Sequence, residues 1–492
     1  MFESAELGHT IDKKTYGRAE PKLRMELLEL QASLLEARRF PVVIITSGID
    51  GAGTGETVNL LNEWMDPRHI ETHAFGDPSD EERERPPIWR FWRALPPRGK
   101  IGIFFGAWHS RPIVDRVLGV TKTADLARSL EEIVRFEQML ADEGALILKF
   151  WFHLGKKQQK KRLTALAKDP NTRWRVTALD WKRFAMYDRF RKVSERALRE
   201  TSTAHAPWIV VEGTDARYRS LTVGRILRDA LKKRLASKED APPRVTAPPL
   251  VRSVDDANVI MALDLHQSVS RHEYDVKLER LQARLAFLSR DKRFHERAVV
   301  VAFEGMDAAG KGGAIRRVTA AVDARFYDVV AVAAPTEEER AQPYLWRFWR
   351  RIPRRGRFTL YDRSWYGRVL VERVEGFCRE SDWMRAYSEI NDFEEHLTRH
   401  GIGVAKFWLT ISKEEQLRRF ELREKTGFKR FKITQEDWRN RKKWDAYVHA
   451  ACDMIDRTST DVAPWTLVEA NDKYFARLKV LRVLCERIEA ML

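Results

Sequence analysis

A strand, a glycine-rich turn and the start of a helix follow one another at residues 298–322, which read AVVVAFE-GMDAAGKGGA-IRRVTAAV. The apolar run is rich in β-branched residues and predicts a buried strand. Gly305 and Gly310 permit the tight turn that follows, and the apolar spacing after Lys311 predicts a helix. The segment from Gly305 to Lys311 therefore matches G-x-x-x-x-G-K, a loop whose backbone amides can surround phosphate oxygens at a helix N-terminus.

A second copy of this pattern lies in the first half of the chain. FPVVIIT at 40–46 leads into GIDGAGTGET at 48–57, and other segments recur at a constant offset of 257 residues. Examples are IWRFWRALPPRGK (88–100) with LWRFWRRIPRRGR (345–357), and HAPWIVVEGTD (205–215) with VAPWTLVEAND (462–472). A match of this length in one register indicates a duplicated domain.

The two copies meet in a stretch rich in proline and charge at 236–257, where the periodic apolar pattern stops. Stretches of this kind act as extended linkers. We therefore predict two domains, 1–245 and 246–492. Within each copy, short β-rich runs alternate with helical patterns, which predicts an α/β fold in which helices wrap both faces of a parallel sheet.

The composition is that of a globular protein with an anionic partner. Of 492 residues, 43% are hydrophobic and 33% charged, and 89 Lys and Arg against 72 Asp and Glu leave a net charge of +17. The three cysteines lie far apart with no CxxC spacing, which argues against a disulfide framework or a zinc site. No apolar run is long enough for a membrane span, and the first residues lack the order of a signal peptide. We expect a cytoplasmic protein.

Two carboxylates are expected near the phosphate loop. Asp307 lies inside the turn, and Asp362 ends the apolar run RFTLYD at 357–362. A strand-end acid beside such a loop can bind magnesium or orient a nucleophile. Arg363 and Arg368 follow and can neutralise charge on a moving phosphoryl group. For Arg363 a plain Asp–Arg ion pair at a strand end remains an alternative.

Two basic segments complete the candidate site. The stretch 422–447 holds Lys429 and Lys432 and predicts a lid over phosphates, with a solvated helix face as the alternative. The stretch 346–357 holds six arginines, among them Arg347, Arg351 and Arg354. Because arginine alternates with tryptophan there, stacking on nucleic-acid bases is a competing interpretation.

The first copy lacks most of these groups. Thr54 stands where the second copy has Lys311, Phe105 where it has Asp362, and Gly106 where it has Arg363. In the lid segment Thr172 replaces Lys429, whereas Asp50 and Arg175 keep the chemical type of Asp307 and Lys432. One preorganised charge donor is typically worth about 3 kcal/mol of barrier, so three losses predict an inactive first copy.

At these residues the chain resembles the family 2 polyphosphate kinases, in their two-domain form. The resemblance rests on GMDAAGKGGAIRRVT, APTEEER with YLWRFWRRIPRRG, YDRSWYGRVLVERV and APWTLVEANDKYFARLKVL, and it covers both halves. It implies a thymidylate-kinase-like P-loop fold with a helical lid, and phosphoryl transfer from inorganic polyphosphate to AMP, giving ADP. It also implies magnesium as cofactor and catalysis by the second domain.

The resemblance assigns roles to residues of the second copy. The catalytic set is Asp307, Lys311, Asp362, Arg363 and Arg368, and the metal ligands are Asp307 and Asp362. The expected phosphate-binding residues are Gly305, Ala308, Ala309, Gly310, Gly312, Gly313, Arg347, Arg351, Arg354, Lys429 and Lys432. Polyphosphate is expected along the arginine segment, with its terminal phosphoryl group in the loop.

Other interpretations stay open at this point. The same loop and lid fit a nucleotide kinase that uses ATP, although the arginine density exceeds what one triphosphate needs. A P-loop scaffold that binds nucleic acid is a weaker alternative, and we do not expect membrane binding. We expect a homodimer in which the first copy supports the second. The preferred polyphosphate length, the choice between AMP and GMP and the base-recognising residues cannot be predicted from spacing.

Overall fold

The computed structural model describes residues 1–237, 259–426, 433 and 435–492. It divides into two compact units. The first comprises residues 1–78, 90–243 and 336–346, and the second comprises 79–89, 244–335 and 347–492. The predicted division at residue 245 stays a prediction.

The first unit is built on a five-stranded parallel sheet in the order β2-β3-β1-β4-β5. The strands are β1 Val42–Gly48, β2 Ile70–Ala74, β3 Ile101–Phe105, β4 Leu146–His153 and β5 Trp208–Glu212. In register, Val42 of the central strand pairs with Ile101 and with Leu146. β1 and β4 are almost wholly buried, as expected for strands covered on both faces.

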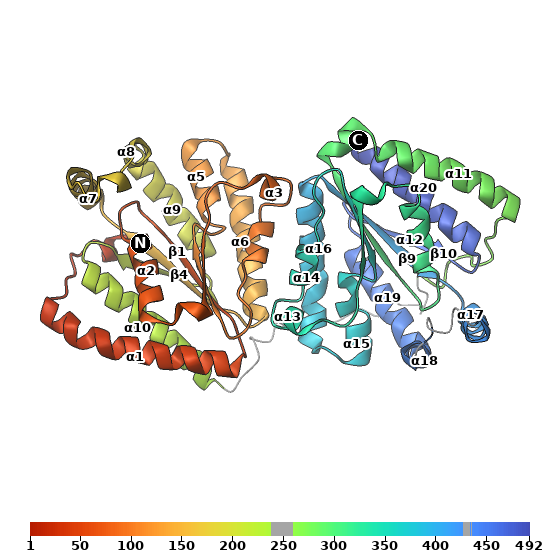
Figure 1. Ribbon diagram of the computed structural model, residues 1–492, viewed down its shortest axis with the longest axis horizontal. Coiled ribbons are helices and arrows are strands. Elements are labelled where there is room, and N and C mark those ends of the chain that lie inside the picture. The colour runs from red at the N-terminus through yellow and green to blue at the C-terminus, as the bar shows by residue number, and fades with distance from the viewer. Residues whose placement is uncertain (238–258, 427–432, 434) are drawn as a thin grey trace. The chain divides into compact units, whose positions relative to one another are not determined.

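Helices cover both faces of this sheet (Figure 1). α1 (Lys13–Ala37), α2 (Thr54–Trp64) and α10 (Ala216–Ala236) pack together on one face. α5 (Ser110–Leu118), α6 (Thr123–Asp142) and α9 (Tyr187–Thr201) pack on the other. The remaining helices of the first half are α3 Asp80–Arg83, α4 Trp89–Arg93, α7 Lys156–Lys168 and α8 Ala178–Ala185.

The second unit repeats this topology. Its five parallel strands run β10-β9-β6-β8-β7, the same order read from the other edge. The strands are β6 Ala298–Gly305, β7 Tyr327–Ala331, β8 Phe358–Asp362, β9 Ile402–Thr410 and β10 Trp465–Glu469. This confirms the predicted fold class, two parallel sheets wrapped by helices.

The helices of the second unit also form two layers (Figure 1). α11 (Arg271–Leu288), α12 (Lys311–Thr319) and α20 (Lys473–Met491) pack on one face. α15 (Val371–Glu375), α16 (Glu380–Arg399) and α19 (Trp444–Thr458) pack on the other. The remaining helices of the second half of the chain are α13 Glu337–Arg340, α14 Trp346–Trp349, α17 Lys413–Lys425 and α18 Gln435–Lys442.

The structure bears on two expectations from the sequence, which concern disulfides and membrane-spanning helices. The three cysteines are unpaired, in agreement with the predicted absence of a disulfide framework. Among the described helices, none has both the length and the apolar character that crossing a bilayer requires.

Candidate active site

The phosphate loop joins the buried strand β6 to helix α12, as the sequence predicts. Gly305 and Gly310 adopt positive φ angles of 137° and 114°, and Ala308 adopts 62°. The Nζ atom of Lys311 donates to the carbonyl oxygens of Gly305 at 2.7 Å and Met306 at 3.3 Å. The side chain of Lys311 therefore folds back onto the loop and contacts two of its carbonyl oxygens.

The predicted strand-end residues lie beside this loop, because parallel strands end at the same edge of a sheet. Asp362 closes β8, and a Cβ atom at Gly312 would lie 3.8 Å from its Oδ2. Arg363 donates to Oδ1 of Asp307 at 3.1 Å. The structure thus brings together the two acids and the arginine that sequence analysis predicted.

A residue that sequence analysis missed holds the other oxygen of Asp307. Asn440, on α18, donates its Nδ2 to Oδ2 of Asp307 at 2.8 Å, and the Tyr447 hydroxyl donates to Oδ1 of Asn440 at 3.3 Å. The first copy has Arg183 at the position of Asn440, at 3.8 Å from Asp50. This difference between the copies was the signal available in the sequence.

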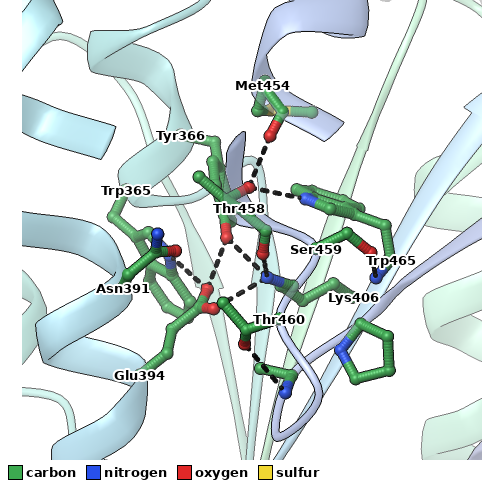
Figure 2. Close-up of polar contacts among 12 residues, drawn as sticks. Trp365, Tyr366, Asn391, Glu394, Lys406, Met454, Thr458, Ser459, Thr460 and Trp465 are labelled. Carbon is green, nitrogen blue, oxygen red and sulfur yellow. Dashed lines mark hydrogen bonds and ion pairs between the residues drawn. The ribbon is translucent and has the colours of Figure 1, made fainter. Parts of the chain in front are cut away.

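The turn after Asp362 is tied to a buried polar network (Figure 2). Nε1 of Trp365 and the hydroxyl of Tyr366 both donate to Oε1 of Glu394, at 3.0 and 2.6 Å. Lys406 donates to Oε2 of Glu394 at 2.7 Å and to the carbonyl oxygen of Thr458 at 2.6 Å. Burial raises the pKa of Glu394 and lowers that of Lys406, and their contact opposes both shifts.

The predicted Arg368 ends the short 3₁₀ turn Trp365–Arg368. Its Nε lies 2.9 Å from an oxygen of Glu372, one helical turn further along the chain. The side chain is mostly buried, at 15% exposure. Arg368 therefore lies on the loop that carries Asp362 and Arg363.

A pocket opens from the phosphate loop toward α18 and α19. Asp307 and Arg363 lie at its polar side, while Trp408, Trp444 and Tyr447 provide aromatic walls. Further lining residues are Glu304, Gly305, Met306, Gly367, Leu370, Val371, Gln416 and Asn440. A pocket that combines charged groups beside a phosphate loop with several aromatic side chains fits a nucleotide.

A second cleft, lined by α12, α17 and α20, also borders the loop and is strongly cationic. Its floor is the loop backbone at Ala308, Ala309 and Gly310. Five cations line it: Arg316, Arg419, Arg423, Lys473 and Arg477. Burial and the neighbouring arginines lower the pKa of Lys473 to about 8.

Sequence analysis missed this cleft, although a signal was present. At the positions of Arg316, Arg423, Lys473 and Arg477 the first copy has Asn59, Leu166, Ala216 and Ser220. Four cations are therefore specific to the second copy. Arg423 lies in the basic stretch 422–447 noted above. The other three were not recognised because they come from the separate helices α12 and α20 and form no long basic run in the sequence.

The arginines of the predicted basic segment have different surroundings in the structure. Arg347 donates to the carbonyl oxygen of Ala333, which follows β7 at the loop's edge of the sheet. Arg351 and Arg354 precede the strand β8, and the carbonyl oxygen of Arg351 accepts a hydrogen bond from the hydroxyl of Thr359, the second residue of that strand. Within the second unit Arg354 forms an ion pair with Glu84. The expected continuous groove from this segment to the loop stays a prediction.

Other predicted residues divide into two groups. Ala309, Gly310, Gly312 and Gly313 belong to the loop and the first turn of α12, where phosphate binding was expected. Lys429 and Lys432 fall outside the described residues, so the predicted lid lysines stay a prediction.

The first unit has a different arrangement at its loop. Glu56, which replaces Gly313, accepts from Arg162 and Arg219 at 2.7 Å each and from Arg175 at 3.2 Å. Arg219 stands where the second unit has Ala476, and its guanidinium also donates to the carbonyl oxygen of Ala52. Side chains of the first unit thus occupy the space that is a cleft in the second.

Comparison with known proteins identifies the family. The family model for polyphosphate kinase 2 (PPK2) matches residues 10–239 and again 268–492. The chain belongs to the polyphosphate kinase 2 family. The two matches account for the internal duplication, since each copy is one unit of this family.

Several curated members of the family are similar over their full length. The polyphosphate:AMP phosphotransferase of Pseudomonas aeruginosa is 62% identical over 490 residues, covering 100% of this chain and 99% of that protein. The protein of the same name from Pseudomonas syringae pv. tomato is 56% identical, covering 99% and 98%. That of Acinetobacter johnsonii is 38% identical, covering 96% of each.

A solved structure agrees with this assignment. A crystal structure of polyphosphate kinase 2 from Pseudomonas aeruginosa PA01 matches with a TM-score of 0.91 and 59% identity. It covers 100% of this chain and 99% of that chain.

Proposed function

We propose that this chain is a polyphosphate:AMP phosphotransferase, which transfers the terminal phosphoryl group of inorganic polyphosphate to AMP. The observation that carries the proposal is the pair of sites that meet at one phosphate loop. The cationic cleft suits a long polyanion, and the aromatic pocket beside Asp307 and Arg363 suits a nucleoside monophosphate. Full-length relatives named for this reaction support the assignment.

In the proposed reaction, an oxygen of the AMP phosphate attacks the terminal phosphorus of polyphosphate. The bond from that phosphorus to the bridging oxygen breaks, and polyphosphate leaves one unit shorter with the electron pair on its new terminal oxygen. The attacking oxygen is already ionised at neutral pH, so no strong general base is required. Lys311 and Arg363 neutralise charge on the transferred group, and the pocket orients the acceptor.

Two carboxylates at the loop fit magnesium, which is usually bound by one or two carboxylates together with substrate phosphates. Asp362 and Asp307 would hold the ion, although Arg363 and Asn440 occupy both oxygens of Asp307 in this structure. When bound, magnesium supplies positive charge that stabilises the phosphate oxygens during transfer. No group of three or more acidic, histidine or cysteine side chains suited to a metal occurs among the described residues.

We further propose that catalysis is confined to the second unit. In the first unit Thr54, Phe105 and Gly106 replace the lysine, the acid and the arginine. A cytoplasmic location and a homodimer stay predictions from the sequence.

The deciding experiment supplies purified protein with magnesium, AMP and long-chain polyphosphate, without ATP, and follows ADP. We expect ADP from the unmodified chain, none from Lys311→Ala, and an unchanged rate from Thr54→Lys. ADP that forms only when ATP is added would instead establish an ATP-dependent nucleotide kinase.

A further inference from the structure

The backbone of Arg363 is strained. Its φ angle is 63°, in the left-handed region, which costs a residue with a side chain about 1–2 kcal/mol. The corresponding residue of the first unit is Gly106, with φ of 75°, which adopts this conformation without such a cost. A strained residue persists at a site only when surrounding contacts fix its conformation. The contacts around Arg363 must therefore offset the strain of its backbone.

Those contacts come from the next residue and from the end of β6. Ser364 donates its backbone N–H to Oε1 of Glu304 at 2.7 Å and its hydroxyl to the same oxygen at 2.8 Å. The backbone N–H of Arg363 donates to the carbonyl oxygen of Phe303 at 3.1 Å. Glu304 is 5% exposed and Ser364 1%. The side chains of Glu304 and Ser364 are thus both shielded from water.

Burial of the Glu304 carboxylate is unfavourable by itself. Burial raises the pKa of Glu304, and the nearby charges of Lys311 and Arg363 and the hydrogen bonds from Ser364 oppose that rise. A buried acceptor that binds both donors of one residue restrains that residue strongly. It also links the strand that leads into the phosphate loop with the turn that carries Arg363.

Comparison with the first unit shows which contacts are common to both units and which occur in the second unit alone. The first unit keeps the network of Figure 2 in a similar form, in which Trp108 and Lys149 donate to Glu137 at 3.0 and 2.7 Å. It lacks the other contact, because Ser47 and Ala107 stand at the positions of Glu304 and Ser364. The contact is therefore absent where the arginine is absent, while the shared network is present in both units.

We propose that Glu304 and Ser364 are positioning residues, which act by holding the strained turn so that the guanidinium of Arg363 faces the phosphate loop. The proposal rests on the function proposed above and assigns a role to two residues of that site. The restraint reaches the reaction through Arg363, whose side chain contacts Asp307. Neither residue needs to contact a substrate.

The test compares Ser364→Ala, which introduces the residue of the first unit, with Ser364→Thr, which keeps a hydroxyl. We expect Ser364→Ala to lower kcat about 10- to 100-fold, because small misplacements of a catalytic group have effects of this size. The KM values for AMP and polyphosphate should change less than about threefold, since substrate binding uses other groups. Ser364→Thr should recover most of the activity.

A double-mutant cycle distinguishes positioning from loss of fold. If Ser364 acts through Arg363, Ser364→Ala should lower kcat little further in an Arg363→Ala background. The thermal unfolding midpoint of each variant is measured in parallel, and Ala107→Ser in the first unit serves as a matched control that should leave activity unchanged.

Three outcomes would overturn the proposal. These are an unchanged kcat in Ser364→Ala, a loss that follows the fall in unfolding midpoint and is not recovered by threonine, and full additivity with Arg363→Ala. An unmodified chain that forms no ADP from polyphosphate would instead reject the proposed function, so the two failures are distinguishable.

Discussion

At the scale of single residues, the two units differ in which amino acids adopt a left-handed backbone. The second unit has Ala308 in the phosphate loop and Arg363 after β8, with φ angles of 62° and 63°. The first unit has glycine at both positions, Gly51 and Gly106. The unit with the proposed catalytic groups therefore has backbone strain at two positions where the other unit has glycine, and such strain is common at active sites.

This contrast predicts the effect of Arg363→Gly. Activity should fall by about 100-fold or more, because a charge donor at the transferred phosphoryl group is lost. The free energy of unfolding should stay the same or rise by up to about 1 kcal/mol, since glycine relieves the backbone strain while one ion pair to Asp307 is lost. Steady-state kinetics and denaturant unfolding measure the two effects.

The matched control is Gly106→Arg in the first unit. A Cβ atom there would lie 2.8 Å from the carbonyl oxygen of Phe75, so this change should destabilise the chain without lowering kcat. A large loss of stability in Arg363→Gly would contradict the interpretation of strain.

At the scale of elements, side chains from three separate helices, rather than one basic run, form the proposed polyphosphate site. The cationic cleft takes Arg316 from α12, Arg419 from α17, and Lys473 and Arg477 from α20. The basic segment before β8 instead forms ion pairs, Arg354 with Glu84 and Arg355 with Glu296. A high density of arginine along the sequence therefore does not indicate which cations surround the loop.

We predict that Arg477→Ala raises the KM for polyphosphate about tenfold, since one charge-assisted contact to phosphate is lost. Arg354→Ala should leave this KM within about twofold, because Arg354 lies at the other end of β8. The comparison uses polyphosphate of one defined length at saturating AMP. The reverse result would restore the groove expected from the sequence.

The lowered pKa of Lys473 predicts a pH dependence. The groups that face it are Arg419, Glu415, Arg418 and Arg477, and burial together with the arginines lowers the pKa to about 8. Below about pH 8 the side chain is charged and can bind phosphate, and above it that charge is lost. The KM for polyphosphate should therefore rise as pH increases through about 8.

The control for this prediction is Lys473→Arg, since arginine stays protonated throughout this range. Its KM should vary less between pH 7 and pH 9. An identical pH profile in both proteins would show that another group titrates.

At the scale of the whole molecule, duplication has produced two loops of which one is filled by its own side chains. Glu56 is held by three arginines, and Arg219 is 4% exposed. A carboxylate among arginines resembles a bound phosphate, since both are anions that accept from guanidinium groups. We therefore expect one polyphosphate site per chain.

Exchange of Glu56 and Gly313, which occupy equivalent positions in the two loops, should change the number of polyphosphate sites per chain. Glu56→Gly removes the internal anion from Arg162, Arg175 and Arg219, and calorimetric titration with tripolyphosphate should then detect a second site. Gly313→Glu should abolish activity, because a Cβ atom at 313 lies 3.4 Å from Arg477 and directs the new carboxylate toward the cleft. A single site in Glu56→Gly would contradict this account.

The sequence by itself determined the α/β fold, the duplication, the phosphate loop and the acid and arginine after β8. These features are local: a strand, a glycine turn and a helix start are encoded by neighbouring residues, and parallel topology then places strand ends at one edge. The match between the two copies also showed which half lacks Lys311, Asp362 and Arg363.

Tertiary structure alone decided which distant residues surround the loop. Asn440 contacts Asp307, Glu304 contacts Ser364, and Lys473 lines the cleft. The partners in each case come from separate elements, and no spacing in the sequence relates them. The arginine segment before β8 shows the same limit, because the structure places Arg347 against Ala333 at the loop's edge of the sheet and Arg354 against Glu84, a difference that the basic run does not reveal. A charge acts through distance in space, and only the packing of helices on the sheet fixes that distance.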